Sequence, residues 1–205
     1  NALDSFSRQV KVSRDPKLVG AINDYLVGSL FYKCLEVLLS RLDRLDVDQL
    51  YWGSAVSLPI LKQMYGIKAE PSDTDILVND SRQEIDLRRL LSGLGNACPT
   101  KFVCDPKDGK FSSLKWITED GTIDITAFSI ISRLRGGNGY ISLEDVLRGC
   151  DLTTSALAYN PKKEEIYYGD GALESFRSRK VDILSATYHT PVTLMCRVVS
   201  TAMLG

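Results

Sequence analysis

The stretch Asp73-Thr74-Asp75-Ile76-Leu77-Val78 has the pattern of a β-strand that carries two carboxylates. Its apolar and β-branched residues are bounded by the turn residues Pro71-Ser72 and Asn79-Asp80. Alternate side chains of a strand point to the same face, so Asp73 and Asp75 are expected to project together, about 6–7 Å apart at the backbone. Paired carboxylates suit Mg²⁺, which binds protein oxygens and phosphates together. The alternative is a chance pair of aspartates in a loop.

A second acidic strand is predicted further along the chain. Residues 114–128 form two alternating runs joined through Asp120-Gly121, a dipeptide that favours a tight hairpin turn. Ile123 and Ile125 should face the core, which leaves Asp124 on the opposite face. There Asp124 could complete a three-carboxylate cluster for two metal ions, or it could be the polar side of an ordinary hairpin.

Gly53-Ser54 precedes a helical pattern that runs from Leu58 to Tyr65 and should end at Gly66. A glycine lets backbone approach a ligand closely, and a serine before a helix offers donors to phosphate. Pro59 is comfortable only in the first helical turn, which favours a start near Ser57.

Further helices are expected from apolar spacing. Asp15 and Pro16 should begin a long N-terminal helix, which Gly28-Ser29 could divide. The full set of expected helical segments is 16–45, 58–65, 82–92, 143–147, 152–158 and 191–204.

Composition indicates a globular chain without an overall nucleic-acid signature. The 205 residues are 44% hydrophobic and 25% charged, and the formal net charge is -1. The five cysteines are scattered without a C-x-x-C pair and there is a single histidine, so too few ligands have the spacing of a structural zinc site. We expect no membrane span, because no apolar run approaches about 20 residues. The scattered, odd number of cysteines and the lack of a signal-peptide pattern at the start favour a reducing, cytoplasmic setting. Because the chain begins at Asn1 and not at a methionine, we expect a fragment or a processed product.

The order of Gly53-Ser54, a helix, Asp73-x-Asp75 and a hairpin with Asp124 resembles the polymerase-β-like nucleotidyltransferase superfamily. Ser142-Leu143-Glu144-Asp145, with the segment from Asp151 to Pro161, is similar to S-L-E-E-D-L-x-R-R-D-F-T-I-N-A-L-A-Y-N-P of bacterial-type CCA-adding enzymes and poly(A) polymerases. Asp170 to Phe176 resembles their D-P-x-G-G-x-x-D-L block, and 191–205 resembles their first neck helix. The likeness covers residues 51–205.

The resemblance implies an α+β (mixed α/β) fold: a nucleotidyltransferase head with a mixed, largely antiparallel sheet flanked by helices. It divides the chain into an N-terminal helical extension (1–50), the head (51–189) and the start of a helical neck (190–205). The implied activity is transfer of a nucleoside monophosphate from ATP or CTP to an acceptor hydroxyl, with an RNA 3′ end as acceptor and two Mg²⁺ ions, or Mn²⁺, as cofactors. The implied catalytic and metal residues are Asp73, Asp75 and Asp124, and the nucleotide-binding residues are Gly53, Ser54, Asp151, Arg148 and Arg197.

The chain departs from the family pattern at its arginines. Gly149 and Cys150 stand where the family has the arginines of R-R-D, and Thr193 and Cys196 stand where its neck has arginine. Arginine grips phosphate through a planar fork of donors. Two alternatives therefore accompany the enzyme hypothesis: a catalytically impaired subunit or binding module with a protein partner or oligomer, and a toxin-like enzyme that nucleotidylates small molecules or proteins.

Overall fold

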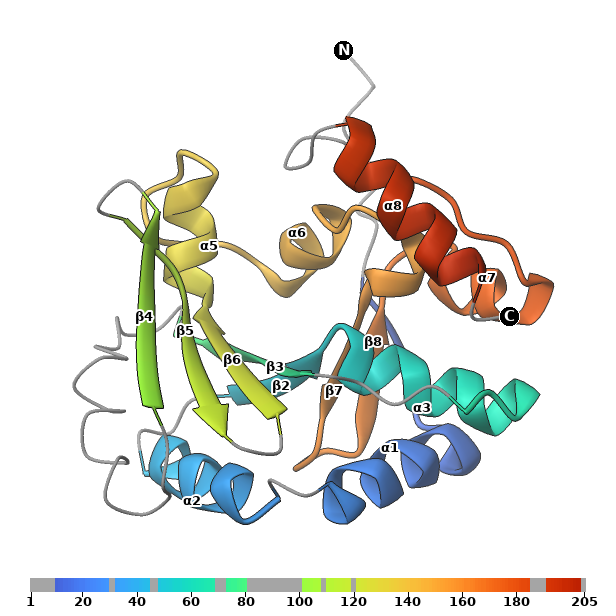
Figure 1. Cartoon of the computed structure of the whole chain (residues 1–205), viewed down its shortest axis with the longest axis horizontal. Helices are drawn as coiled ribbons and strands as arrows, with labels where there is room; N and C mark the ends of the chain where they lie inside the picture. Colours follow the sequence, from blue (N-terminus) through green and yellow to red (C-terminus); the bar gives the residue numbers. More distant parts are fainter. Residues whose placement is uncertain are drawn as a thin grey trace.

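A computed structural model of the chain describes residues 10–29, 32–44, 48–68, 73–80, 101–107, 110–118, 121–184 and 191–203. The described strands form one twisted sheet of eight strands in the order β1-β8-β7-β2-β3-β6-β5-β4 (Figure 1). Within the described part, β3 and β6 pair in parallel and the other neighbours pair antiparallel. The expected mixed, largely antiparallel sheet is confirmed. The strands are β1 Lys11–Ser13, β2 Asp48–Trp52, β3 Asp73–Asn79, β4 Lys101–Lys107, β5 Lys110–Thr118, β6 Gly121–Ala127, β7 Leu157–Asn160 and β8 Glu165–Tyr168.

Helices cover both faces of this sheet (Figure 1). The helices α1, α2 and α3 lie on one side, whereas α5 and α6 lie on the other. The buried apolar residues of α7 belong to the same cluster as those of α1, α2 and α3, and α8 lies beside α7 in Figure 1. The helices are α1 Pro16–Gly28, α2 Tyr32–Asp43, α3 Ser54–Tyr65, α5 Phe128–Leu134, α6 Leu143–Arg148, α7 Ala172–Ser178 and α8 Pro191–Ala202, with a 3₁₀ turn at Thr153–Ser155. No helix in the described ranges is both long and apolar enough to cross a membrane.

Two apolar clusters hold the layers together, one on each face. Alternation along β3 sends Ile76 and Val78 into the cluster shared with α1, α2 and α3, and Leu77 into the cluster shared with α5 and α6. All three side chains are at most 1% exposed. Burying one such side chain stabilises a fold by about 1.5–3 kcal/mol, so β3 is anchored from both sides.

The N-terminal helical pattern is divided as expected. Asp15 caps α1 by accepting a hydrogen bond from the backbone N–H of Lys17 at 2.9 Å, and Pro16 occupies the first turn. The helix ends at Gly28, and α2 begins at Tyr32. Buried residues of α1 share the core of the sheet, while the boundaries at 50/51 and 189/190 remain predictions.

The expected start of the second helical segment near Ser57 is wrong, because α3 begins at Ser54. The carbonyl oxygen of Gly53 accepts hydrogen bonds from the N–H groups of Val56 and Ser57, which closes the first turn before Pro59 is reached. Pro59 then lies buried inside the helix, where it removes one i→i−4 hydrogen bond. The predicted stop is confirmed, since Gly66 ends α3 with a φ of 68°.

The expected helix at 152–158 is also wrong. A single 3₁₀ turn, Thr153–Ser155, leads directly into β7, whose four residues are all buried between β2 and β8. A short apolar run has no reliable period, and pairing on both edges selects the strand. The helices at 143–147 and 191–204 are confirmed as α6 and α8, and the hairpin as β5 and β6. The expected helix at 82–92 lies outside the described residues.

Candidate functional site

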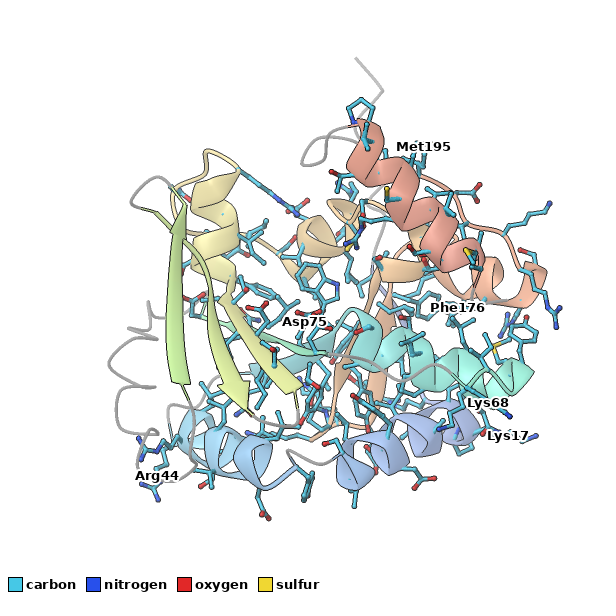
Figure 2. All side chains as sticks on the ribbon, in the orientation of Figure 1. Lys17, Arg44, Lys68, Asp75, Phe176 and Met195 are labelled. Carbon is cyan, nitrogen blue, oxygen red and sulfur yellow. The ribbon has the colours of Figure 1, made fainter. Side chains whose placement is uncertain are left out.

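The centre of the candidate site is the start of β3, near the middle of the molecule (Figure 2). Asp73 and Asp75 are partly exposed, while Thr74 and Ile76 between and after them are buried on the opposite face. The hydroxyl of Ser54, the first residue of α3, donates a hydrogen bond to Oδ1 of Asp73 at 3.2 Å. The structure therefore brings the start of α3 and the acidic strand together.

Gly53 closes the other side of this junction. A Cβ atom built on Gly53 would lie 2.5 Å from Oδ2 of Asp75, and the residue has a φ of 65°. Such a φ strains a residue with a side chain, and contact at 2.5 Å would displace the carboxylate. Glycine is thus required here by the backbone angle and by the approach of Asp75.

Asp124 lies on the neighbouring strand. The parallel pairing of β3 with β6 sets Asp75 opposite Asp124, with Ile123 and Ile125 fully buried on the other face. On the other side of β3, Trp52 of β2 is the register partner of Asp75. A row of Trp52, Asp75 and Asp124 therefore crosses three strands on the face that carries α5 and α6.

Carboxylate oxygens are the donor set that Mg²⁺ prefers, so Asp73 and Asp75 fit that ion chemically. The absent side chain of Gly53 leaves the space next to Oδ2 of Asp75 unfilled by a Cβ atom. Within the described residues, however, no three acidic, histidine or cysteine side chains are gathered closely enough to hold a metal ion. The three-carboxylate cluster therefore remains a prediction, with Asp124 on the same face as the pair and beside Asp75 in the register.

Trp52 connects this row to the segment that follows α6. Its indole Nε1 donates to the carbonyl oxygen of Ser155 at 3.0 Å, and the thiol of Cys150 donates to the same oxygen at 3.4 Å. Burial, with the negative charge of Asp151 beside it, raises the pKa of Cys150 to about 12. Cys150 is therefore a neutral packing residue and not a nucleophile at ordinary pH.

Asp151 and Arg197, both expected at the nucleotide, form an ion pair. The guanidinium of Arg197, on α8, contacts both carboxylate oxygens of Asp151, with Nη2 at 3.4 Å from Oδ1. Oδ1 also accepts the N–H of Leu152 at 3.0 Å. Asp151 is 8% exposed, whereas the side chain of Arg197 is 47% exposed. The pair ties α8 to the segment beside Trp52.

Arg148 is not brought to this pair. It forms ion pairs with Glu144 and Asp145 of its own helix and is about half exposed. A helical neighbour at i−4 or i−3 is in easy reach of a long side chain, which holds Arg148 on the outer surface of α6.

The guanidinium of Arg135 lies directly beside Gly149. A Cβ atom on Gly149 would be 2.0 Å from Nη2 of Arg135, so the guanidinium of Arg135 fills the space of a side chain at 149. Its Nη1 donates to the carbonyl oxygen of Asp145 at 2.6 Å. The sequence alone did not indicate Arg135; the glycine at 149, a position that lets another group approach, was the only signal.

The fold defines the class: the chain has a nucleotidyltransferase head fold, with a mixed sheet flanked by helices. Three solved structures show the likeness. A CCA-adding enzyme of Thermotoga maritima, complexed with tRNA, has a TM-score of 0.53 at 20% identity over 80% of this chain. A CCA-adding enzyme in complex with ATP has a TM-score of 0.56 at 17% identity over 86%. A tRNA-processing enzyme in an apo form has 0.58 at 14% identity over 84%.

The likeness is partial in length and low in identity. This chain spans 36%, 38% and 41% of those three structures. No model of a known protein family matches the sequence, and none of the curated proteins matches it. A structural likeness at such low sequence identity establishes the fold alone.

Proposed function

We propose that the chain is a metal-dependent nucleotidyltransferase that transfers a nucleoside monophosphate from a nucleoside triphosphate to an RNA 3′-hydroxyl. The observation that carries the proposal is the junction of Gly53 and Ser54 with Asp73 and Asp75. Ser54 binds one carboxylate at 3.2 Å, and the missing side chain of Gly53 leaves room for the other.

Each residue of the junction has a distinct role in the proposed reaction. The N–H groups in the first turn of α3 face phosphate oxygens, a favourable place for negative charge at a helix N-terminus. When the nucleotide binds, the Ser54 hydroxyl exchanges its hydrogen bond to Asp73 for one to a phosphate oxygen. Asp73 and Asp75, assisted by Asp124, hold Mg²⁺ in its preferred oxygen ligation. Bound Mg²⁺ lowers the pKa of the attacking hydroxyl and stabilises charge on the leaving pyrophosphate.

The bond changes are those of an in-line displacement. The acceptor oxygen bonds to the α-phosphorus, the bond from that phosphorus to the β-phosphate oxygen breaks, and the hydroxyl proton leaves to solvent. The residues around the row contribute orientation. Trp52 and the Asp151–Arg197 pair fix the wall beside Asp75 through the bonds to Ser155 and α8. ATP or CTP as donor and RNA as acceptor are supported by the ligands of the similar structures, which include tRNA, ATP and CTP.

A transfer assay with labelled nucleoside triphosphates, Mg²⁺ or Mn²⁺ and a short RNA primer tests the proposal. The wild type should extend the primer, and Asp75→Asn or Asp73→Asn should reduce the rate by about 100-fold or more, since each removes a charge that acts in the transition state. Asp24→Asn, an exposed acid on α1, is the matched control and should keep wild-type activity. Equal activity in Asp75→Asn and the wild type would sink the proposal.

One observation favours a second candidate, a binding module that has lost catalysis. Arg148 and Arg197 are both engaged with acidic side chains, so neither is positioned to grip a triphosphate without giving up an ion pair. Calorimetry with ATP and CTP in the presence of Mg²⁺ separates the candidates. Absence of heat for every nucleotide, in a protein that remains folded, would favour the binding module.

A further inference from the structure

Six exposed cationic side chains gather at the end of the molecule where α3 and α7 finish and α1 begins. We call this surface the basic end, and it consists of Lys17, Lys62, Lys68, Arg177, Arg179 and Lys180. Figure 2 shows Lys17 and Lys68 at this end, Arg44 at the opposite end and Asp75 between them. A chain with a formal net charge of -1 thus carries a locally positive surface away from the acidic strand.

An aromatic stack joins the two helix ends. The guanidinium carbon of Arg179 lies 4.3 Å from the centre of the Tyr65 ring, and the Tyr65 hydroxyl donates to the carbonyl oxygen of Phe176. The stack holds a planar guanidinium at the surface with its donors in a fixed orientation. The neighbouring lysines are therefore presented around a rigid centre.

Helix stability explains only part of this charge. Lys62 and Arg177 lie in the last turns of α3 and α7, where cations interact favourably with the helix dipole. Lys17 instead lies in the first turn of α1, where a positive charge is disfavoured. Arg179 has a φ of 54°, a left-handed conformation that strains a residue other than glycine. Two of the six cations are thus placed against local stability.

We propose that the basic end binds the sugar–phosphate backbone of a nucleic acid; that this nucleic acid is the RNA acceptor rests on the proposed function. Lysines act as point charges toward phosphates, and the stacked guanidinium adds a directed fork. In the described part, no large apolar side chain is exposed on α3 or α7. A membrane-surface binder needs apolar groups among its cations, so the composition of this surface favours a nucleic acid.

Two triple variants test the proposal with the same change of net charge. The test variant is Lys17→Gln, Lys68→Gln and Lys180→Gln, which leaves the Arg179–Tyr65 stack intact. The control is Arg44→Gln, Lys162→Gln and Lys163→Gln, which removes three exposed cations elsewhere on the surface. Circular dichroism and thermal melting verify that both variants remain folded.

Binding is measured by fluorescence anisotropy of a labelled single-stranded RNA, without nucleoside triphosphate, over a range of salt concentrations. Each lost phosphate contact should reduce the slope of log K against log salt by about 0.7, so the test variant should lose about 2 from the slope. The control should keep the wild-type slope. Equal loss in both variants, no loss in either, or binding of the wild type to anionic vesicles but not to RNA would overturn the proposal.

Two further measurements distinguish a failure of this inference from a failure of the proposed function. The affinity for a DNA strand of the same sequence shows whether the surface distinguishes RNA from DNA. Equal affinity for DNA and RNA would contradict the assignment of RNA as the bound nucleic acid. Asp75→Asn should abolish transfer and leave RNA binding unchanged. If the wild type transfers nothing while the salt slopes differ as expected, the proposed function fails and the basic end stands.

Discussion

Gly53 and Asp75 show how one absent carbon atom can decide the geometry of a site. The φ of 65° and the 2.5 Å approach both depend on the lack of a side chain at residue 53. Asp75 in turn is fixed by its register, between Trp52 and Asp124. The geometry of the site therefore depends on having glycine at residue 53 and a carboxylate at residue 75.

Gly53→Ala should reduce nucleotide transfer by about 10-fold or more and lower stability by about 1–3 kcal/mol, since the added Cβ strains the backbone and displaces Asp75. Rates in the primer assay and urea unfolding measure the two effects. Gly20→Ala is the control, because it lies in α1 with no atom within 4 Å of an added Cβ. There alanine should be neutral or stabilising by up to about 1 kcal/mol. Wild-type rate and stability in Gly53→Ala would contradict the argument.

Among the elements, β3 is tied to the helix that covers its acidic face. Asp80, the residue after β3, is 3% exposed and accepts the N–H of Ser129 at 2.8 Å and its hydroxyl at 2.5 Å. Ser129 lies in the first turn of α5, where a carboxylate satisfies orphan donors and favours the positive end of the helix. One buried carboxylate therefore positions α5 over the candidate site.

Asp80→Ala should lower the free energy of unfolding by about 2 kcal/mol, because two buried donors lose a charged acceptor. Urea unfolding followed by circular dichroism measures the change. The exposed Asp24→Ala should shift stability by no more than about 0.5 kcal/mol. A loss in Asp80→Ala no larger than that of the control would show that the cap is unimportant.

Across the whole molecule, α8 is the most weakly anchored described helix on its own packing. Leu194 is its one buried apolar residue, while Val192, Met195 and Val199 of the helix and Met203 directly after it are exposed. The Arg197–Asp151 pair supplies a polar anchor to the segment beside Trp52. The attachment of α8 therefore depends on an ion pair between the buried Asp151 and the half-exposed Arg197.

A double-mutant cycle with Arg197→Gln and Asp151→Asn tests this attachment. Solvent screens the exposed guanidinium, so the coupling energy should be about 1 kcal/mol. Arg197→Gln should cost more stability than Asp151→Asn, because it leaves a buried carboxylate without its cation. Hydrogen exchange in α8 should accelerate in both single variants. If the stability losses of the two single variants simply add and hydrogen exchange in α8 is unchanged, the ion pair does not hold α8 in place.

Local patterns in the sequence were enough to predict several elements. The strand at Asp73, the hairpin with Asp124, the break after Gly28 and the stop at Gly66 each depend on neighbouring residues alone. Alternation and turn chemistry act over a few residues, so these features can be predicted from the sequence. The likeness of the acidic strand to nucleotidyltransferases followed from the same local order.

Only the tertiary structure decided which distant groups meet. The strand at Leu157–Asn160 was selected by pairing with β2 and β8, and the approach of Arg135 to Gly149 and of Arg197 to Asp151 joins residues far apart in the chain. The parallel pairing that sets Asp124 beside Asp75 belongs here as well. Side-chain encounters depend on packing across the sheet, and the period of a single segment contains no information about its partners.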